Sequence, residues 1–411
     1  MFIKHLSLTN FRNFVRLELD LTSEVTVLQG DNAQGKTNLL EAIYYLATTR
    51  SPRTSSDRLL INWLADEEDL PYSRLVAEVQ RAGMMNKIEI AIAKEANDAE
   101  PQRMVLRKRV RLNGANKRAA DILGQLNAVL FMPEDIDLVG GTASLRRHCL
   151  DDALSQIDPA YYRYLRRYTR VVSQRNVLLR LIRDGRAGRD ELEFWDQNLV
   201  RYGSVIIARR EQAVQHLNTL VTEVHSALTG AGEHLRLEYL CSVPRLEPAH
   251  AGYQIPLLNQ DLGLIEWSEL DAVAHAIADQ FTTHLLSVRE QEIARGVSLV
   301  GPHRDDLRFL VNGVDMKVFG SRGQQRTVTL SFKLAEVRFM HLMRGEMPVL
   351  LLDDVISELD ATRRGYLMNT INQAQQVIMT TTDLAPYSPQ FLRNASLLQV
   401  CGGRLRPLSL P

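Results

Sequence analysis

Residues Glu24–Ala47 read EVTVLQGDNAQGKTNLLEAIYYLA, and they predict a strand, a glycine-rich loop and a helix in direct succession. The run Val25–Leu28 is short, apolar and β-branched, as in a buried strand. After the loop, Leu39–Ala47 places apolar residues three and four positions apart, the spacing of one helix face. Between them, Gly30–Thr37 matches the pattern G-x-x-x-x-G-K-[ST] in full. The alternative is a glycine-rich turn before an ordinary helix, and the complete strand–loop–helix context disfavours it.

The loop carries the groups that bind the phosphates of a nucleoside triphosphate. Its glycines allow the main chain to turn N–H groups toward phosphate oxygens. Lys36 supplies a positive charge for the β- and γ-phosphates, and Thr37 offers a hydroxyl to Mg²⁺. The following helix adds the positive end of its dipole. We assign the nucleotide contacts to Gly30, Asp31, Asn32, Ala33, Gln34, Gly35, Lys36 and Thr37.

A second apolar run, near the other end of the chain, ends in two carboxylates. Val349–Leu352 has the pattern of a central strand covered on both faces, and Asp353 and Asp354 follow it. Ligands of open α/β sheets bind where parallel strands end. We therefore expect Asp353 to hold Mg²⁺ beside Thr37, and Asp354 to orient or deprotonate the attacking water. The alternative, a core strand ending in a polar turn, is disfavoured by the phosphate loop in the same chain. The catalytic candidates are Asp354 and Lys36.

Most of the chain lies between these two motifs, so one site must be assembled around an insertion. We predict an α/β fold in which mixed β-sheets surround the phosphate-loop helix. Its parts are residues 1–135, an inserted mainly α-helical domain of residues 136–295, and residues 296–411. Alternating apolar residues predict strands within 6–21, 75–92, 104–112 and 307–311, and a short strand at 376–380. Helical spacing predicts helices within 145–183, 191–229, 271–295, 322–344 and 361–374.

Composition narrows the class of protein. Lys and Arg number 49 and Asp and Glu also 49, which argues against a uniformly basic nucleic-acid coat but allows local basic patches. No apolar run reaches the ~18 residues of a membrane span, and the N-terminus has no signal-peptide pattern. The three cysteines, Cys149, Cys241 and Cys401, lack metal-ligand spacing. We expect a cytoplasmic protein whose cysteines are small buried residues, and no membrane partner.

Further motifs resemble a known family. Ser321–Gln325 (SRGQQ), at the start of a predicted helix, resembles the signature motif of ABC-type ATPases, and Ser357–Asp360 (SELD) resembles their D-loop. With the motifs below, essentially the whole chain is similar to the RecF family of bacterial DNA-repair proteins, whose ABC-type heads are related to those of chromosome-maintenance proteins. Those motifs are Thr9–Phe14, Phe131–Ile136, Leu145–Arg147, Gln174–Asn176, Leu178–Leu179 and Gly301–Asp306.

The resemblance implies an ABC-type ATPase head that dimerises around ATP and Mg²⁺. The phosphate loop of one subunit would then face the signature motif of the other. Members of the family are slow, DNA-stimulated ATPases that act as clamps on single-stranded and gapped DNA. With RecO and RecR they help to load RecA. The site residues that the resemblance adds are Arg12 and Asn13 beside the nucleotide, Ser321, Gly323 and Gln324 in trans, and Ser357 and Asp360 in the D-loop.

The chain departs from the wider ABC pattern at three places. The Q-loop stretch Phe131–Ile136 has Pro-Glu where a glutamine is usual, and Asp354 replaces the usual glutamate. The switch-histidine position, within Thr380–Asp383, carries threonines. A shorter base and no switch histidine favour weak turnover, so we expect a switch more than a motor.

Two runs, residues 101–120 and residues 160–183, are rich in arginine and contain no acidic residue. Such clusters attract the DNA backbone without reading its sequence. A solvated protein face explains each run about as well as a DNA contact does. Four tyrosines of the second run, Tyr161, Tyr162, Tyr164 and Tyr168, fit core packing better than base stacking. The candidate DNA contacts are Arg107, Lys108, Arg109 and Arg111, and Arg163, Arg166, Arg167 and Arg170.

Two other classes of ATPase fit the sequence less well. The head of another chromosome-maintenance or RecN-like protein would carry long coiled-coil arms, but this insertion has no sustained heptads. A transporter ATPase subunit would have a compact insertion, a Q-loop glutamine and a switch histidine, and the sequence shows none of them.

Overall fold

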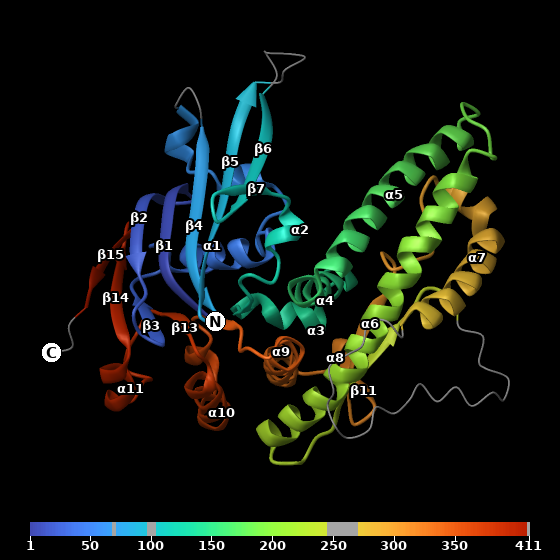
Figure 1. The fold of residues 1–411 in the computed structure, drawn as a ribbon. Coiled ribbons are helices and arrows are strands. Elements are labelled where there is room, and N and C mark those ends of the chain that lie inside the picture. Colours follow the sequence, from blue (N-terminus) through green and yellow to red (C-terminus); the bar gives the residue numbers. More distant parts are fainter. Residues whose placement is uncertain (68–70, 97–103, 245–269, 409–411) are drawn as a thin grey trace. The chain divides into compact units, whose positions relative to one another are not determined.

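The computed structural model describes residues 1–67, 71–96, 104–244 and 270–408 (Figure 1). The chain forms two compact units: the head unit, Met1–Asp135 with Arg344–Pro411, and the inserted unit, Ile136–Met343. The chain leaves the head unit after Asp135 and returns to it at Arg344. The inserted domain was predicted to end at residue 295. In the structure residues 296–343 also belong to the inserted unit.

The head unit contains an antiparallel sheet with the strand order β2-β1-β4-β5-β6-β7. Its alternating residues are the ones that the sequence indicates: Leu6 lies opposite Leu19 and Leu8 opposite Leu17, and all four are buried. The strands are β1 (Phe2–Phe11), β2 (Phe14–Asp20), β4 (Tyr72–Arg81), β5 (Met84–Ala96), β6 (Met104–Leu112) and β7 (Ala115–Lys117). The predicted strands of this region are confirmed.

The second sheet of the head unit has the order β15-β14-β3-β13-β12-β8 and is parallel except at β15. All residues of β12 are buried, as expected for a central strand. The sequence analysis did not predict β8, β14 or β15. The strands are β3 (Val25–Gln29), β8 (Ala128–Phe131), β12 (Val349–Asp353), β13 (Val377–Thr381), β14 (Ser396–Cys401) and β15 (Arg404–Pro407).

The helix α1 (Lys36–Thr48) belongs to the core that both sheets build. Its apolar residues are almost completely buried all round, because β4 and β5 of one sheet and β8, β12 and β13 of the other contact it. The predicted α/β class, with mixed sheets around the phosphate-loop helix, is confirmed. Two 3₁₀ turns, η1 (Asp57–Leu60) and η2 (Trp63–Glu67), follow α1, and α2 (Ala119–Ile122), η3 (Pro133–Ile136), η5 (Ile356–Glu358), α10 (Ala361–Gln373) and α11 (Pro389–Asn394) complete the unit.

The inserted unit is mainly helical, as predicted. Its long helices α5, α6 and α7 pack on one another. A three-stranded sheet with the order β11-β10-β9 accompanies them, and β9 was not predicted. The elements are α3 (Asp137–Gly140), α4 (Ala143–Ile157), α5 (Pro159–Arg183), α6 (Leu192–Thr229), β9 (Leu235–Leu240), α7 (Leu270–Arg295), β10 (Asp306–Val311), β11 (Val314–Asp315), α8 (Met316–Phe319) and α9 (Arg322–Arg344).

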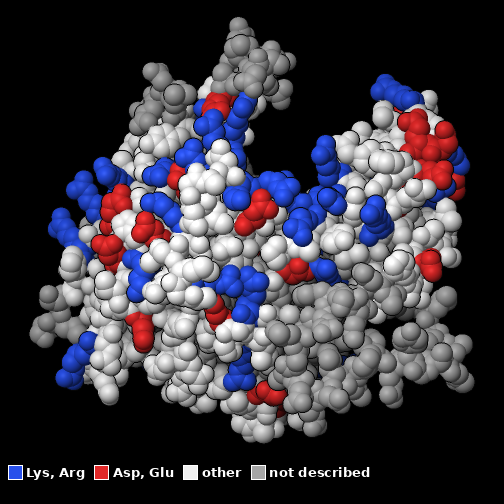
Figure 2. Space-filling model, viewed as in Figure 1, with Lys and Arg blue, Asp and Glu red and all other residues white. Residues whose placement is uncertain are grey.

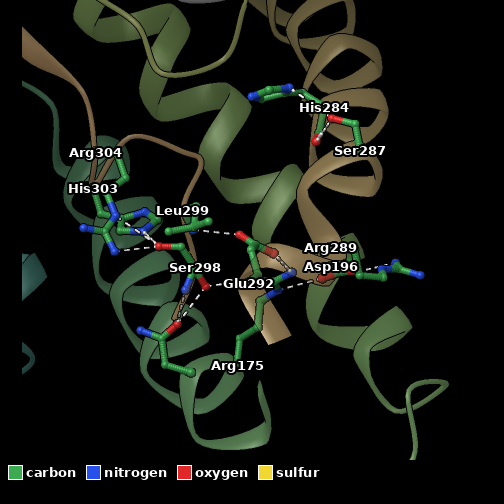
Figure 3. A network of polar contacts seen from close by, with 11 residues as sticks. Arg175, Asp196, His284, Ser287, Arg289, Glu292, Ser298, Leu299, His303 and Arg304 are labelled. Atoms are coloured by element: carbon green, nitrogen blue, oxygen red, sulfur yellow. Dashed lines mark hydrogen bonds and ion pairs between the residues drawn. The ribbon is translucent and has the colours of Figure 1, made fainter. Parts of the chain in front are cut away.

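A buried ionic network joins the three long helices (Figure 3). Arg175 of α5 is completely buried and pairs with Asp196 of α6 and Glu292 of α7, each at 2.6 Å. Its third contact is a hydrogen bond of 2.8 Å to the hydroxyl of Ser298. Arg289 also pairs with Asp196. Because the two carboxylates and the guanidinium satisfy one another, the helices can bury these charges together.

The motif Gly301–Asp306 extends this polar interior. Arg146 of α4 makes two hydrogen bonds to Asp306, at 2.6 and 2.9 Å. Asp305 is buried and accepts hydrogen bonds from the hydroxyl of Tyr239 and the main chain of Ser242. Arg210 of α6 donates to the Pro302 carbonyl at 2.6 Å. The motif therefore fastens the start of β10 to β9 and to the helices of the inserted unit.

Among the described residues, no helix is long and apolar enough to span a membrane. In the described part of the chain, Cys149, Cys241 and Cys401 form no disulfide. The expectation that they are buried is wrong for Cys401, which is exposed in the β14–β15 hairpin, and Cys149 and Cys241 are half-buried.

Replacing Arg175 by Met should destabilise the inserted unit, because it leaves two buried carboxylates without their shared cation. We expect a loss of about 3 kcal/mol or more in the free energy of unfolding. Far-UV circular dichroism during urea unfolding measures it, since the helices of this unit dominate the signal. The matched control is Arg189→Met, which breaks an exposed pair with Glu290 and should cost about 1 kcal/mol or less. Equal losses in the two variants would contradict the structural role of the network.

Candidate functional site

The phosphate loop has the geometry that its sequence predicts. Gly35 lies at the N-cap of α1 with φ of 109°, a left-handed conformation that favours glycine. A Cβ atom at this position would also collide with the side-chain amide of Asn13. The loop lines a cavity of about 460 Å³, a volume in the range of small-molecule sites. Its lining residues are Asn13, Asp31, Asn32, Ala33, Gln34, Gly35, Lys36, Thr37, Asn38, Arg53, Trp63, Pro133, Asp353 and Asp354.

Lys36 is the cation of the loop. Its ammonium group donates to the carbonyl oxygens of Gly30 and Asp31, which hold it over the cavity. Burial lowers the pKa of Lys36, while the carboxylates of Asp354 and Asp353 act in the opposite direction. A partly desolvated ammonium between carboxylates and an anion-binding loop can bind a phosphate oxygen more strongly than an exposed one.

The two predicted halves of the site are in direct contact. The Thr37 hydroxyl donates to Oδ2 of Asp353 at 2.7 Å, across 316 residues of sequence. The hydroxyl of Thr380, on the neighbouring strand β13, donates to the other carboxylate oxygen at 2.7 Å. Thr380 belongs to the stretch where the wider ABC pattern carries a switch histidine, and here it orients the carboxylate at the end of β12.

The donor set suits magnesium. Thr37 and Asp353 offer a hydroxyl and a carboxylate at one point of the cavity. Among the described residues, no cluster of three or more His, Cys, Asp and Glu could enclose a metal ion. Mg²⁺ is commonly bound by one or two protein oxygens, with water and phosphate completing its shell. The pair therefore fits this ion.

Asp354 has an unfavourable main-chain conformation. Its φ of 49° lies in the left-handed region, which costs free energy for a residue other than glycine. Its N–H donates to the Thr380 hydroxyl at 3.0 Å, and its carbonyl accepts from the hydroxyl of Ser357 at 2.7 Å. Oδ1 of its carboxylate is buried and has no hydrogen-bond partner among the described residues. Asp354 lines the cavity beside Lys36 and Asp353, so it is the candidate residue for orienting a water molecule there.

The corner between β1 and β2 supports the loop. The amide of Asn13 donates to the Gln34 carbonyl at 2.9 Å and accepts from Asn38 at 2.8 Å. Arg12 does not line the cavity: its guanidinium forms two hydrogen bonds with the buried carboxylate of Glu41 on α1. A direct contact of Arg12 with nucleotide stays a prediction, and its observed bonds hold the corner against α1.

Several residues of the site were missed by the sequence analysis. Gly402 and Gly403, in the β14–β15 turn, donate to the side chain and main chain of Gln34, at 2.8 and 3.1 Å. Arg53 and Trp63 line the cavity from the segment after α1. No motif marks these positions: Gly402 and Gly403 reach the site through the pairing of β14 with β3, and the segment that carries Trp63 bonds to β1 through Asn62 and Ile61.

The predicted signature motif lies in the inserted unit, at the start of α9. The Ser321 hydroxyl accepts a hydrogen bond from the N–H of Gln324 at 3.3 Å, and the Gln324 side chain accepts one from the N–H of Ser321 at 3.1 Å. This reciprocal pair is a capping box. Ser321 and Gly323 are exposed, and open space surrounds Gly323. The motif therefore presents an uncovered helix N-terminus, which suits an anion.

The predicted D-loop has two local roles in the structure. Ser357 donates to the Asp354 carbonyl, as described above. Asp360 is the N-cap of α10, where it accepts from the N–H of Arg363 at 2.9 Å. These contacts leave any role toward a second subunit a prediction.

The basic run on β6 is not free of acidic partners, although no acidic residue occurs within it. Strand β5 supplies them: Arg107 and Arg109 pair with Glu95, and Arg111 approaches Glu89 at 3.7 Å. Lys108 pairs with Asp57 and lies over the ring of Tyr45. Glu95, Glu89 and Asp57 therefore offset part of the charge of this run, and Glu89 is shared with Arg74.

The basic run on α5 differs. Arg163, Arg166, Arg167 and Arg170 are all exposed, and in the described part of the chain no ion pair joins them to a carboxylate. Arg166 lies over the ring of Tyr162 and Arg167 over that of Tyr202. Figure 2 shows basic side chains along α5 on this face, while acidic ones gather near one end of the helix. Tyr161, Tyr162 and Tyr168 are buried, which confirms core packing for these three, and Tyr164 is half-buried.

Comparison with known proteins places this arrangement in a family. Residues 2–390 match the family model described as the RecF/RecN/SMC N terminal domain. The chain is 42% identical to the DNA replication and repair protein RecF of Roseiflexus castenholzii, over 99% of this chain and 100% of the relative. It is 36% identical to that of Bacillus mycoides, over 98% of each.

A solved structure shares the fold over nearly the whole chain. It is the structure of the recombination mediator protein RecF-ATP in the RecFOR pathway, and it superposes with a TM-score of 0.81 at 30% identity. The similarity covers 99% of this chain and 98% of the other.

Replacing Asp354 by Asn tests its role in water activation. Asn tolerates the left-handed conformation, so the strand end should keep its shape. We expect a nucleoside triphosphate to bind as tightly as before and its hydrolysis to slow by about 100-fold, the usual contribution of a general base. Phosphate release in single turnovers measures the rate. In the companion variant Lys36→Met, binding itself should be lost. Unchanged hydrolysis in Asp354→Asn would transfer the role to another residue.

Proposed function

The chain belongs to the RecF family of DNA replication and repair proteins, and we propose that it works as a DNA-binding switch controlled by ATP. The observation that carries this proposal is the contact between the phosphate-loop residue Thr37 and Asp353 at the end of β12. It brings a phosphate-binding loop and a metal-binding carboxylate to one cavity, beside Asp354. The RecF structure with ATP supports ATP as the nucleotide.

In this proposal the loop N–H groups and Lys36 bind the β- and γ-phosphates, and Thr37 and Asp353 hold Mg²⁺. Bound magnesium would neutralise the charge that develops on the phosphate oxygens. Asp354 orients a water molecule toward the γ-phosphorus and accepts its proton as the bond to ADP breaks. One short carboxylate performs this step, so we propose slow turnover that times a switch.

We propose that the switch is an ATP-dependent homodimer. The exposed N-terminus of α9, with Ser321, Gly323 and Gln324, would face the γ-phosphate bound by a second copy of the chain. Ser321 has a free lone pair beyond its capping bond, and the exposed start of a helix favours an anion. Because ADP lacks the γ-phosphate, hydrolysis would remove the group that the two chains share. A ligand can shift such an equilibrium only through this difference in contacts.

We propose DNA as the macromolecular ligand, bound through α5 in preference to β6. The arginines of α5 are exposed and without carboxylate partners in the described structure, whereas those of β6 are paired with Glu95 and Glu89. Unpaired arginines can replace condensed counterions on the DNA backbone at lower cost. By resemblance to the family, single-stranded and gapped DNA are the proposed substrates, RecO and RecR the proposed partners, and RecA loading the proposed outcome in the cytoplasm.

The dimer is tested at Ser321. Ser321→Arg introduces bulk and positive charge opposite Lys36 of the second copy, so the variant should bind ATP but stay monomeric and fail to hydrolyse it. Sedimentation with ATP and with ADP, beside a nucleotide titration, measures both properties. Ser321→Asp is the control for folding: it keeps the helix cap but repels the γ-phosphate, so it too should block dimerisation. Dimerisation of either variant with ATP, or loss of the first ATP-binding event, would refute the trans contact.

The DNA surface is tested by two sets of alanines. Replacing Arg163, Arg166, Arg167 and Arg170 should weaken binding of gapped DNA at every sequence. The slope of log K against log salt should fall in magnitude by up to about 3, since each phosphate contact contributes about 0.7 to 0.9. Replacing Arg107, Arg109 and Arg111 should change both quantities little. The reverse outcome would assign DNA binding to β6. If neither set changed the affinity or its salt dependence, both runs would be solvated surfaces that do not bind DNA.

A further inference from the structure

We infer that Trp63 provides the stacking surface for the base of the bound nucleotide. This inference rests on the proposed function of the phosphate loop and extends it to the part of the ligand that the loop does not bind. Lys36, Thr37 and the loop amides recognise phosphate and metal, and none of them selects for a base. Trp63 lines the same cavity, and its side chain is a large flat ring system.

The indole is exposed at a point where the main chain is firmly anchored. Trp63 is 66% exposed, although Leu60 and Ala65 on either side belong to the head core. The N–H of Asn62 donates to the Asn10 carbonyl at 2.9 Å, and Ile61 forms a β-bridge with Phe11. A fixed turn that directs its largest apolar side chain to solvent loses the hydrophobic gain of burying it. A ligand that covers the ring would recover that gain.

The anchor of Trp63 is also the support of the phosphate loop. Asn10 and Phe11, which hold the turn, precede Asn13, whose amide contacts both Gln34 and Asn38. The side-chain oxygen of Asn62 caps the next turn by accepting from the N–H of Leu64 at 2.8 Å. The β1–β2 corner therefore fixes the main chain at Trp63 and the phosphate loop relative to each other. Such pre-organisation lowers the cost of binding a ligand at two points.

The ligand class follows from the chemistry of the ring. A nucleobase stacks on an aromatic face through its own flat surface, and every base has such a face. A purine covers more of an indole than a pyrimidine does, so stacking favours purine nucleotides without distinguishing adenine strongly from guanine. The polar groups of the loop bind the phosphates at the other end. The structure thus assigns a purine nucleoside triphosphate to the cavity, with Trp63 on its base.

The test compares a ligand that has a base with one that has none. Isothermal titration with Mg²⁺ measures the affinities of ATP and of inorganic tripolyphosphate for the full chain. Trp63→Ala should weaken the affinity for ATP by about tenfold, the usual contribution of one stacked base. The affinity for tripolyphosphate should stay unchanged. Trp63→Phe keeps an aromatic face and should restore most of the loss. Leu59→Ala is the matched control, because Leu59 is 59% exposed on the preceding turn and does not line the cavity.

The outcomes separate this inference from the proposed function. Unchanged ATP affinity in Trp63→Ala, or an equal loss for ATP and tripolyphosphate, would refute the stacking role while leaving the phosphate site intact. An equal loss in Leu59→Ala would refute it as well, because the effect would then come from the turn. If the unmodified chain bound neither ATP nor tripolyphosphate, or if Lys36→Met bound both normally, the proposed nucleotide site itself would fail.

Discussion

The hydrogen bond between Thr37 and Asp353 depends on a parallel sheet that joins the two ends of the chain. Strand β3 leads into the phosphate loop, β12 ends at the carboxylates, and β13 lies between them and pairs with both. Thr380 on β13 then bonds to the side chain of Asp353 and to the main chain of Asp354. A shift of one residue in this register would turn these side chains to the other face. The chemistry of the cavity is thus fixed by main-chain pairing.

The chemical centre of the site could be predicted from the sequence because each half is a local pattern. Strand, loop and helix adjoin at Gly30–Thr37, and the run Val349–Leu352 ends at its carboxylates. The supports of the site could not be predicted in this way. Trp63 lines the cavity from the segment after α1, while Thr380 and the Gly402–Gly403 turn hold its residues Asp353 and Gln34 from distant parts of the chain. The strand at 376–380 was predicted, but nothing in its sequence reveals the bond between Thr380 and Asp353, and no motif marks Trp63 or the Gly402–Gly403 turn.

The same distinction applies to the fold and to the charged runs. Strands with clear alternation, such as β1 and β4, were predicted, while β8 has only four residues and no alternation to reveal it. The run on β6 looked unopposed because its carboxylates come from β5 across the sheet. The family motifs around Arg146, Arg175 and Asp306 were recognisable, but their contacts were not: Arg146 pairs with Asp306, and Arg175 pairs with Asp196 and Glu292 inside the inserted unit.

The discontinuous head unit has a consequence for biosynthesis. A ribosome releases the chain from the N-terminus, so Val25 emerges long before its partner strand residue Val377. The inserted unit is complete once Met343 has emerged, and its contacts lie within one continuous segment. We therefore expect it to fold while β3 and α1 still lack β12 and β13. During this interval the apolar residues of α1 lack part of the core that buries them. We therefore expect chaperones to bind the nascent head unit.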